Sequence, residues 1–270
     1  LSPLRNWDEA WYAEIIKNMA SGNYNLLVPF WNGEYYFDKG PLYFWLSLPI
    51  VKLFGIGEWQ VRFVSVIAAA FSVALIYLIG RKLFNKVSGI FASIIFISLG
   101  QVYVRFSHGN LDALLTVFFL STFYFWLKKD DNKRWVVLSG IFLGLGFLIK
   151  GWALGLFPLY LIFLHSFFKE RKLLPQGFPI LIVSAILASS WWYVLGIREF
   201  GNEFSNWYLL TAAEGTLNSP FVNFSLKPVE YFVRDLGVWL FFIPAVFFSL
   251  KKKIGANFSV VITLLLVSAS

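Results

Sequence analysis

The chain is a succession of long apolar runs, each closed by a short cluster of charged residues. A helix needs about 20 apolar residues to cross the hydrocarbon of a bilayer, and only helices or closed barrels can pair every backbone group there. Runs of roughly this size cover residues 60–79, 87–104, 111–127, 135–149, 152–168, 178–197 and 236–250, with a partial run over 258–270. Because 58% of the residues are hydrophobic, a soluble domain could not bury them all. The pattern predicts an all-α, polytopic transmembrane helical bundle.

The charged connections between these runs form two alternating sets. One set holds only three of the fifteen acids and most of the clustered cations, which are Arg81, Lys82, Lys86, Lys128, Lys129, Lys133, Arg134, Lys169, Arg171, Lys172, Lys251, Lys252 and Lys253. Connections rich in Lys and Arg stay on the cytoplasmic side of a membrane. We therefore expect a multi-pass protein of the plasma (cell inner) membrane, with the acidic connections outside. Topology then explains the net charge of +8, and no nucleic-acid partner is expected.

Two long polar segments on the predicted outer side divide the chain. Residues 1–59 are interpreted as an outer catalytic loop, 60–197 as transmembrane helices, 198–235 as a second outer loop and 236–270 as further transmembrane helices. Within the first loop, residues 42–54 are apolar but too short to span, which favours an interfacial or re-entrant helix on the outer face. The chain starts at Leu1 and stops inside an apolar run, so we expect a longer protein with a transmembrane helix before Leu1.

The first polar segment carries the residues best suited to chemistry. Asp8 and Glu9 precede a helical pattern over 11–19, and Asp38 and Lys39 stand near the end of the segment. A carboxylate can accept a proton from an attacking hydroxyl, and a lysine is a point charge suited to a phosphate. The segment therefore suggests chemistry on a charged lipid.

Further charged residues fall at the predicted outer ends of the spans. Arg105 and Asp112 stand seven residues apart before one span, Lys150 ends another, and Lys227 lies in the second outer loop. Ionisable groups at membrane depth are costly and usually functional. Two or more cations around a phosphate, with a carboxylate nearby, would suit group transfer from a phospholipid-type donor.

Several kinds of site are not expected. The chain has no cysteine, which excludes a disulfide, a thiol nucleophile and a cysteine-ligated metal. With only two histidines, His108 and His165, a histidine-built metal site is not expected either, and a divalent cation is left open as a cofactor. No nucleotide-binding glycine motif occurs.

Four motifs in fixed order resemble the C-type membrane glycosyltransferases. They are DE-xx-YAE, which contains Tyr12, then NGE-xx-F-D-K-x-P, then R-x6-D and finally IKG. Within that class they are most similar to the branch of protein O-mannosyltransferases and the lipid A aminoarabinose transferase. The resemblance covers roughly residues 6 to 235. It implies inverting transfer of a sugar from a polyprenyl-phosphate donor to a lipid or protein acceptor on the outer face of the membrane.

The resemblance also implies roles for individual residues. Asp8 matches the acid proposed as catalytic base, with Glu9 as its neighbour and Tyr12 in the same motif. Lys39 matches the lysine that contacts the carrier phosphate, after the acid Asp38. Asp112 matches an aspartate that lines the cavity in the family, and Arg105 matches the arginine before it. Lys150 matches the lysine of IKG, and Lys227 resembles a basic residue of a late outer loop.

Each of these residues also has a purely structural interpretation. Asp8 and Glu9 could cap a helix, and Asp38 with Lys39 could be a surface ion pair. Arg105 and Asp112 could pair across a short turn, and Lys150 could snorkel at a helix end. These interpretations can hold together with a catalytic one.

Two other classes of function stay open. A secondary transporter also has many spans with buried charges, although it typically shows internal repeats and broken helices at midplane. A non-catalytic lipid-binding or scramblase-like protein would use the same phosphate-binding lysines without needing Asp8. Sugar transfer requires that acid, whereas binding does not.

Overall fold

The computed structural model describes residues 3–4, 8–152, 156–171 and 175–207. Residues 208–235 of the predicted second outer loop (198–235) and the predicted runs 236–250 and 258–270 lie outside the described residues, as does Lys227. The described elements, in order, are α1 (Asp8–Ser21), β1 (Phe30–Trp31), β2 (Glu34–Tyr35), α2 (Leu42–Phe54), α3 (Glu58–Leu83), α4 (Lys86–Ser98), α5 (Gly100–Phe106), α6 (Leu111–Leu127), α7 (Arg134–Lys150), α8 (Leu156–Glu170) and α9 (Phe178–Asn206). The prediction of a mainly helical chain is confirmed.

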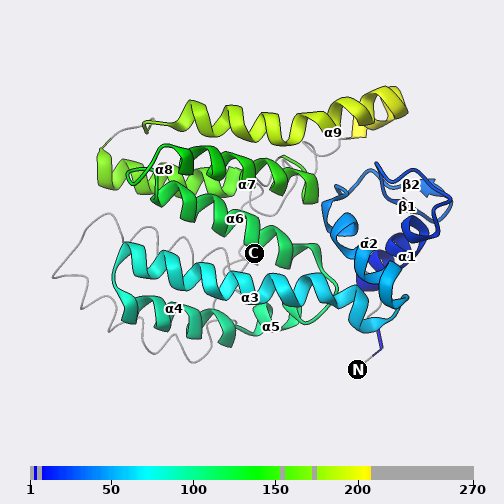
Figure 1. The fold of residues 1–270 in the computed structure, drawn as a ribbon, viewed down its shortest axis with the longest axis horizontal. Helices are drawn as coiled ribbons and strands as arrows, with labels where there is room; N and C mark the ends of the chain where they lie inside the picture. Colours follow the sequence, from blue (N-terminus) through cyan, green and yellow to red (C-terminus); the bar gives the residue numbers. More distant parts are fainter. Residues whose placement is uncertain (1–2, 5–7, 153–155, 172–174, 208–270) are drawn as a thin grey trace, which may run out of the picture.

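The long helices lie side by side, and the first segment gathers at one end of them. In packing order the neighbours are α4, α3, α6, α7 and α9, with α8 beside α6. Figure 1 shows α1, α2 and the two strands at the end where α3 begins. Both α1 and α2 pack against α3, and α2 also contacts α7. The first segment is therefore joined to the bundle at the ends of several helices.

Apolar length predicts the spans only in part. Among the described helices, α3 and α9 are long and apolar enough to cross a membrane, and a third crossing exists if α4 and α5 count as one broken span. The predicted run 87–104 is divided between two helices, because α4 and α5 meet at Leu99 with a bend of 70°. Leu99 is in extended conformation, which breaks the i to i−4 hydrogen-bond ladder there. Helix α6 matches the predicted run 111–127 in both bounds.

The far end of α9 also differs from the expectation. The run 178–197 was predicted to end before a polar loop, but α9 continues to Asn206. Gly201 interrupts it with φ 60° and ψ −136°, a conformation that glycine adopts without steric cost. Phe204, beyond this kink, is buried against Trp192 and Gly196 of the same helix. Burial of this aromatic ring explains why a polar stretch stays helical.

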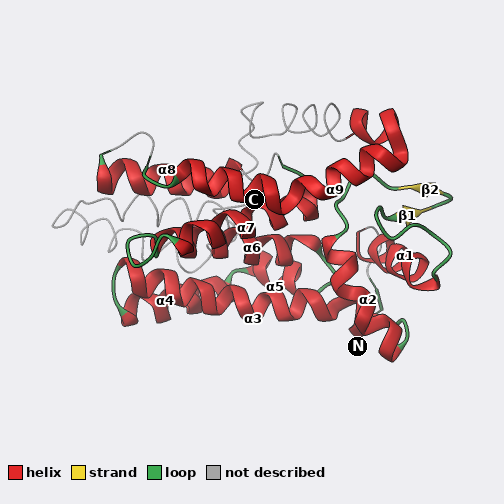
Figure 2. Ribbon diagram, turned by 45° about the horizontal axis from the view of Figure 1, so that its top comes forward, coloured by secondary structure: helices red, strands yellow, loops and turns green. Residues whose placement is uncertain are grey.

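A short β-hairpin departs from the all-α prediction. Phe30 pairs with Tyr35 and Trp31 with Glu34, and Figure 2 shows this hairpin beside α1. Asn32 and Gly33 connect the strands with φ of 50° and 88°. Two successive residues with positive φ form the tight turn that Asn-Gly favours between antiparallel strands.

Glycines let α7 approach α9 closely. A β-carbon at Gly140 or Gly144 would collide with the backbone carbonyls of Leu181 and Ala185. Small residues of this kind allow helix backbones to pack together in membrane proteins. Gly140 and Gly144 therefore lie where the α7 and α9 backbones approach most closely in this contact.

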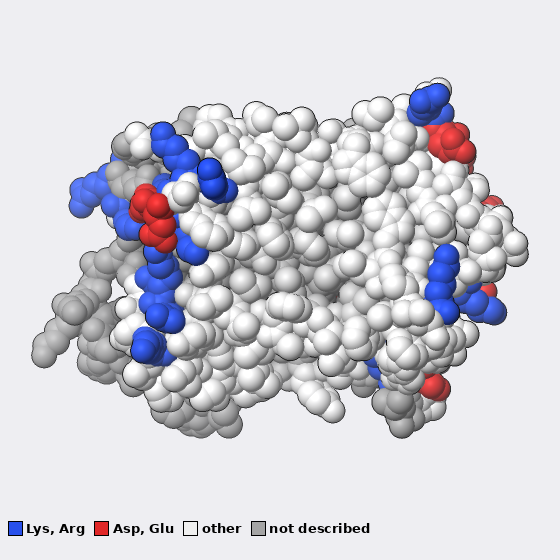
Figure 3. Space-filling view, viewed as in Figure 1, with Lys and Arg blue, Asp and Glu red and all other residues white. Residues whose placement is uncertain are grey.

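Charged side chains gather at the two ends of the molecule. Figure 3 shows a wide uncharged band between them. At one end, cations from the α3–α4 and α6–α7 connections stand with Asp130 and Asp131. The other end is formed by the first segment. This distribution is the one expected for a bundle that crosses a membrane.

Candidate functional site

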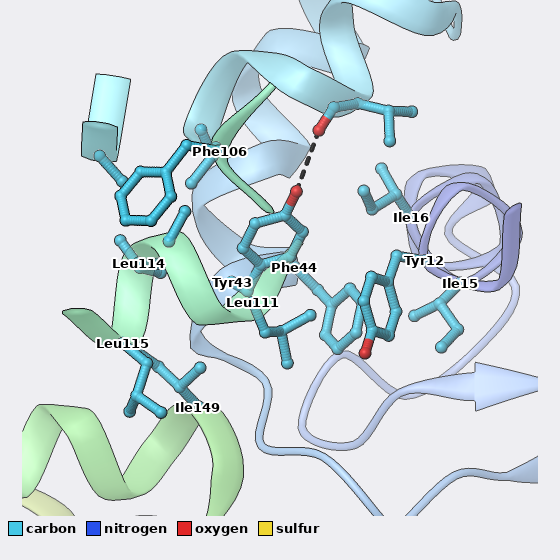
Figure 4. Close-up of a cluster of buried hydrophobic side chains, with 14 of the residues drawn as sticks. Tyr12, Ile15, Ile16, Tyr43, Phe44, Phe106, Leu111, Leu114, Leu115 and Ile149 are labelled. Atoms are coloured by element: carbon cyan, nitrogen blue, oxygen red, sulfur yellow. Dashed lines mark hydrogen bonds between the residues drawn. The ribbon is translucent and has the colours of Figure 1, made fainter. Parts of the chain in front are cut away.

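Helix α1 is held against the bundle by its apolar face. Tyr12, Ile15 and Ile16 are buried, and Figure 4 shows them beside Phe44 and Tyr43 of α2. The Tyr12 ring meets that of Phe44 edge-on, with ring centroids 5.8 Å apart. This packing fixes the first turn of α1, which carries Asp8 and Glu9.

The two adjacent carboxylates have opposite surroundings. Glu9 is 3% exposed and accepts hydrogen bonds from Arg62 Nε at 2.7 Å and Arg62 Nη2 at 3.1 Å. Its Oε1 also accepts the backbone N–H of Gly109 at 2.9 Å. Asp8 is exposed, because successive side chains of a helix point about 100° apart. Glu9 therefore joins α1, α3 and the loop before α6, while Asp8 faces outward at the site.

A buried polar network holds the start of α6. Asn110 accepts a hydrogen bond from the Asp112 backbone N–H at 2.7 Å and so caps the helix. Ser65 Oγ accepts the Asn110 N–H at 2.9 Å and donates to the Asn110 carbonyl at 3.0 Å. Tyr43 donates to the Val61 carbonyl at 3.0 Å, the bond drawn in Figure 4. These bonds fix the position of Asp112.

Asp112 joins two cations from different elements. Its Oδ2 accepts from Arg105 Nη1 at 2.9 Å, and its Oδ1 pairs with Lys150 at the end of α7. The pairing of Arg105 with Asp112 across the turn is confirmed. All three side chains keep part of their surface exposed, so their charges can act on a bound molecule.

The loop after the hairpin brings a further cation, Lys39, to the end of α7 that carries Lys150. The Gly40 N–H donates to the Ile149 carbonyl at 2.9 Å, which fastens the loop to the last turn of α7. Lys39 pairs with Asp38, and the Tyr36 hydroxyl donates to the same carboxylate at 3.0 Å. Because Gly40 is fastened beside Lys150, Lys39 lies at the same end of α7 as the Lys150–Asp112 pair.

Gly40 is required for this attachment. A β-carbon at position 40 would collide with the backbone carbonyl of Leu148. Since backbone cannot move aside like a flexible side chain, we expect Gly40→Ala to cost about 1–3 kcal/mol of stability, the usual effect of overpacking. Gly100→Ala is the control, because nothing lies within 4 Å of a β-carbon there. Denaturant titration of both variants in detergent checks this, and equal stability of the two would contradict it.

Two phenols complete the site. Burial raises the pKa of Tyr12, and the charges of Asp8 and Asp112 raise it further. Burial and Asp38 raise the pKa of Tyr36. Because a negative neighbour disfavours a phenolate, both hydroxyls stay protonated at neutral pH and can donate hydrogen bonds.

Most of the residues predicted from sequence come together here. The site contains Asp8, Tyr12, Asp38, Lys39, Arg105, Asp112 and Lys150. Glu9 instead points into the core, and Lys227 lies outside the described residues. Tyr36 was not predicted as a site residue, although its position two residues before Asp38, within the second motif, could have indicated it. Among the described residues, no group of three His, Cys, Asp or Glu side chains could hold a metal ion.

The helical arrangement is that of the C-type class of membrane glycosyltransferases, as comparison with known proteins shows. Residues 38–197 match the dolichyl-phosphate-mannose-protein mannosyltransferase family, and the chain belongs to that family. The match covers more than half of the chain and includes the Lys39, Arg105, Asp112 and Lys150 positions.

Similar proteins agree with this assignment. The chain is 34% identical over 171 residues to the undecaprenyl phosphate-alpha-4-amino-4-deoxy-L-arabinose arabinosyl transferase of Wigglesworthia glossinidia brevipalpis, which covers 60% of this chain and 30% of that protein. The protein of the same name from Aeromonas hydrophila is 32% identical over 206 residues, 73% of this chain and 38% of that one. The chain thus spans about a third of the length of these curated relatives.

A solved structure shares the fold. ArnT from Cupriavidus metallidurans bound to undecaprenyl phosphate superposes with a TM-score of 0.69 at 20% identity, over 99% of this chain and 56% of that one. The Archaeoglobus fulgidus oligosaccharyltransferase in complex with Zn and sulfate gives a TM-score of 0.56 at 17% identity, over 93% and 37%. The helical arrangement is therefore that of a multi-pass membrane protein.

Proposed function

We propose that the complete protein transfers a sugar from a polyprenyl-phosphate donor to a lipid or protein acceptor on the outer face of the cell inner membrane. One observation carries the proposal: Asp112 pairs with both Arg105 and Lys150, and the loop that carries Lys39 is hydrogen-bonded through Gly40 to Ile149, next to Lys150. The exposed Asp8 begins α1 at the same end of the bundle. The relatives named above are transferases of undecaprenyl-phosphate-linked aminoarabinose by name. The site also lies opposite the lysine-rich end, which supports an outward-facing orientation.

The chemistry requires one base and a set of cations. The acceptor O–H gives its proton to the Asp8 carboxylate as its oxygen attacks the anomeric carbon from the side opposite the phosphate. The bond from that carbon to the phosphate oxygen breaks, and polyprenyl phosphate leaves with the electron pair. Inversion at the anomeric carbon follows from this single displacement. Cations already in place stabilise the charge that develops on the leaving phosphate.

The other acids of the site have positioning roles in this proposal. Asp112 holds Arg105 and Lys150 at the same place, since each of its oxygens binds one of them. The ion pair of Glu9 and Arg62 fixes α1 against α3. In this proposal it thereby fixes the position of Asp8 relative to Arg105 and Lys150. Glu9 itself is assigned no proton transfer, because it is buried in its own ion pair.

The donor-binding role of Lys39 leads to a direct test. We expect Lys39→Ala to weaken binding of undecaprenyl phosphate about 10- to 100-fold, because a hydrogen bond to a charged group is worth about 1.5–3 kcal/mol. Lys17→Ala is the matched control, since Lys17 lies exposed on α1 with Glu14 as its partner. Native mass spectrometry of the complete protein at increasing lipid concentration measures both. Equal affinities of Lys39→Ala and wild type would remove Lys39 from the donor site.

A further inference from the structure

A cavity lined by cations lies at the end of the molecule opposite the candidate transferase site. It has a volume of about 350 Å³ and is lined by Leu78, Arg81 and Lys82 of α3 and by Tyr124 of α6 with Lys128 after it. Lys128 follows Asp112 by 16 residues along α6, which corresponds to about 24 Å of helix. The cavity is therefore separate from the candidate transferase site.

The cavity holds more positive charge than its neighbours balance. Lys82 pairs with Asp131, whose two oxygens lie at 3.1 and 3.0 Å from Nζ. Arg81 makes no ion pair with any of the residues that the structure describes. Lys128 lies over the Trp135 ring, 3.6 Å from its centroid, and forms no ion pair with a carboxylate among the described residues. Three cations thus face one carboxylate.

The lining is amphipathic as well as cationic. Leu78 and Tyr124 are half-buried and offer apolar surface beside the charged groups. The cavity is lined by cations of the charged end, and Figure 3 shows that an uncharged band adjoins this end of the molecule. In a bilayer the cavity would lie at the depth of the lipid headgroups, and the acyl chains would lie alongside α3 and α6. Basic pockets between membrane helices at such a level suit anionic lipid headgroups.

We propose that this cavity binds the phosphate of an anionic phospholipid, with Arg81 and Lys128 as its principal ligands. Lys82 adds charge but shares it with Asp131. The glycerophosphate fits between the cations, and the first acyl carbons contact Leu78 and Tyr124. The site does not depend on the proposed transfer reaction, because none of its residues belongs to the transferase site.

Lipid titration by native mass spectrometry tests the proposal. The complete protein in detergent is mixed with phosphatidylglycerol, and the binding of the tightest lipid is compared between wild type and Arg81→Gln/Lys128→Gln. We expect affinity to fall about 30-fold in this double variant, since each cation near an anionic lipid contributes roughly a fivefold factor. Asp131→Asn should tighten binding, because it releases Lys82. A fall of less than threefold in the double variant would overturn the proposal.

A matched control separates this cavity from general attraction to the basic end. Lys86→Gln/Lys133→Gln removes the same charge at the same end of the molecule from residues that do not line the cavity. We expect this control variant to bind its tightest phosphatidylglycerol with the affinity of wild type. An equal loss of affinity in both double variants would contradict a defined site. Inorganic phosphate distinguishes the source of the anion. Displacement of the lipid by millimolar phosphate would show a site for a soluble anion and overturn the lipid assignment.

Discussion

We expect Asp8→Asn to lower the rate of sugar transfer by about 100- to 10,000-fold while leaving donor binding close to wild type. Asparagine keeps the size and the hydrogen-bonding shape of the side chain but cannot accept the proton of the acceptor hydroxyl. Asp8 is exposed, so the variant replaces no buried side chain. The measurement is the rate of undecaprenyl phosphate release by the complete protein, with donor affinity measured in parallel.

Glu14→Gln provides the matched control for this experiment. It makes the same carboxylate-to-amide change on the same helix, but Glu14 is half-exposed and, among the described residues, pairs with Lys17 alone. Its transfer rate should stay within twofold of wild type. Full transfer by Asp8→Asn would remove Asp8 as the base, and equal losses in both variants would point to the stability of α1 instead.

The second large effect is expected at the buried pair of Glu9 and Arg62. Arg62→Met should lower the free energy of unfolding by about 3–5 kcal/mol, because it leaves the Glu9 carboxylate buried without its cation. Only 3% of Glu9 is exposed, so water cannot replace the lost bonds. Unfolding of the detergent-solubilised protein by urea measures the change.

Two further variants make this prediction specific. Glu9→Leu/Arg62→Met should be more stable than Arg62→Met alone, since removing both members of a buried pair costs less than removing one. Lys17→Met removes a cation from an exposed pair and should change stability by less than about 1 kcal/mol. A loss of under 1 kcal/mol in Arg62→Met would show that the pair does not hold α1 in place.

The helices could be predicted from sequence because apolar runs and charged connections are local signals. The run 111–127 became α6 and the run 42–54 became α2 with the same bounds. The bend at Leu99 was not predicted, since apolar length says nothing about a local break in hydrogen bonding. The hairpin was missed although Asn32-Gly33 is a strong turn signal, because the surrounding strands have only two residues each.

The site could be predicted only as a set of residue types. Motif resemblance indicated Asp8, Lys39 and Asp112, but their convergence depends on contacts between distant segments. Arg62 binds Glu9 from 53 residues away, and Gly40 is fastened to Ile149 on another helix. The separation of Asp8 from Glu9 into an exposed and a buried role needs the orientation of α1, which follows from packing against Phe44 and Tyr43. Such long-range contacts are not encoded in any short pattern.

Transfer by the complete protein is the measurement that tests the central claim most directly. The protein is reconstituted with undecaprenyl-phosphate-linked aminoarabinose and with lipid A as acceptor, and released undecaprenyl phosphate and modified lipid are followed by mass spectrometry. We predict that wild type releases the carrier and modifies the acceptor, whereas Asp8→Asn binds the donor and leaves it intact. If wild type binds the donor but never cleaves it with any lipid or protein acceptor, the protein is a lipid-binding protein and the transferase account is wrong.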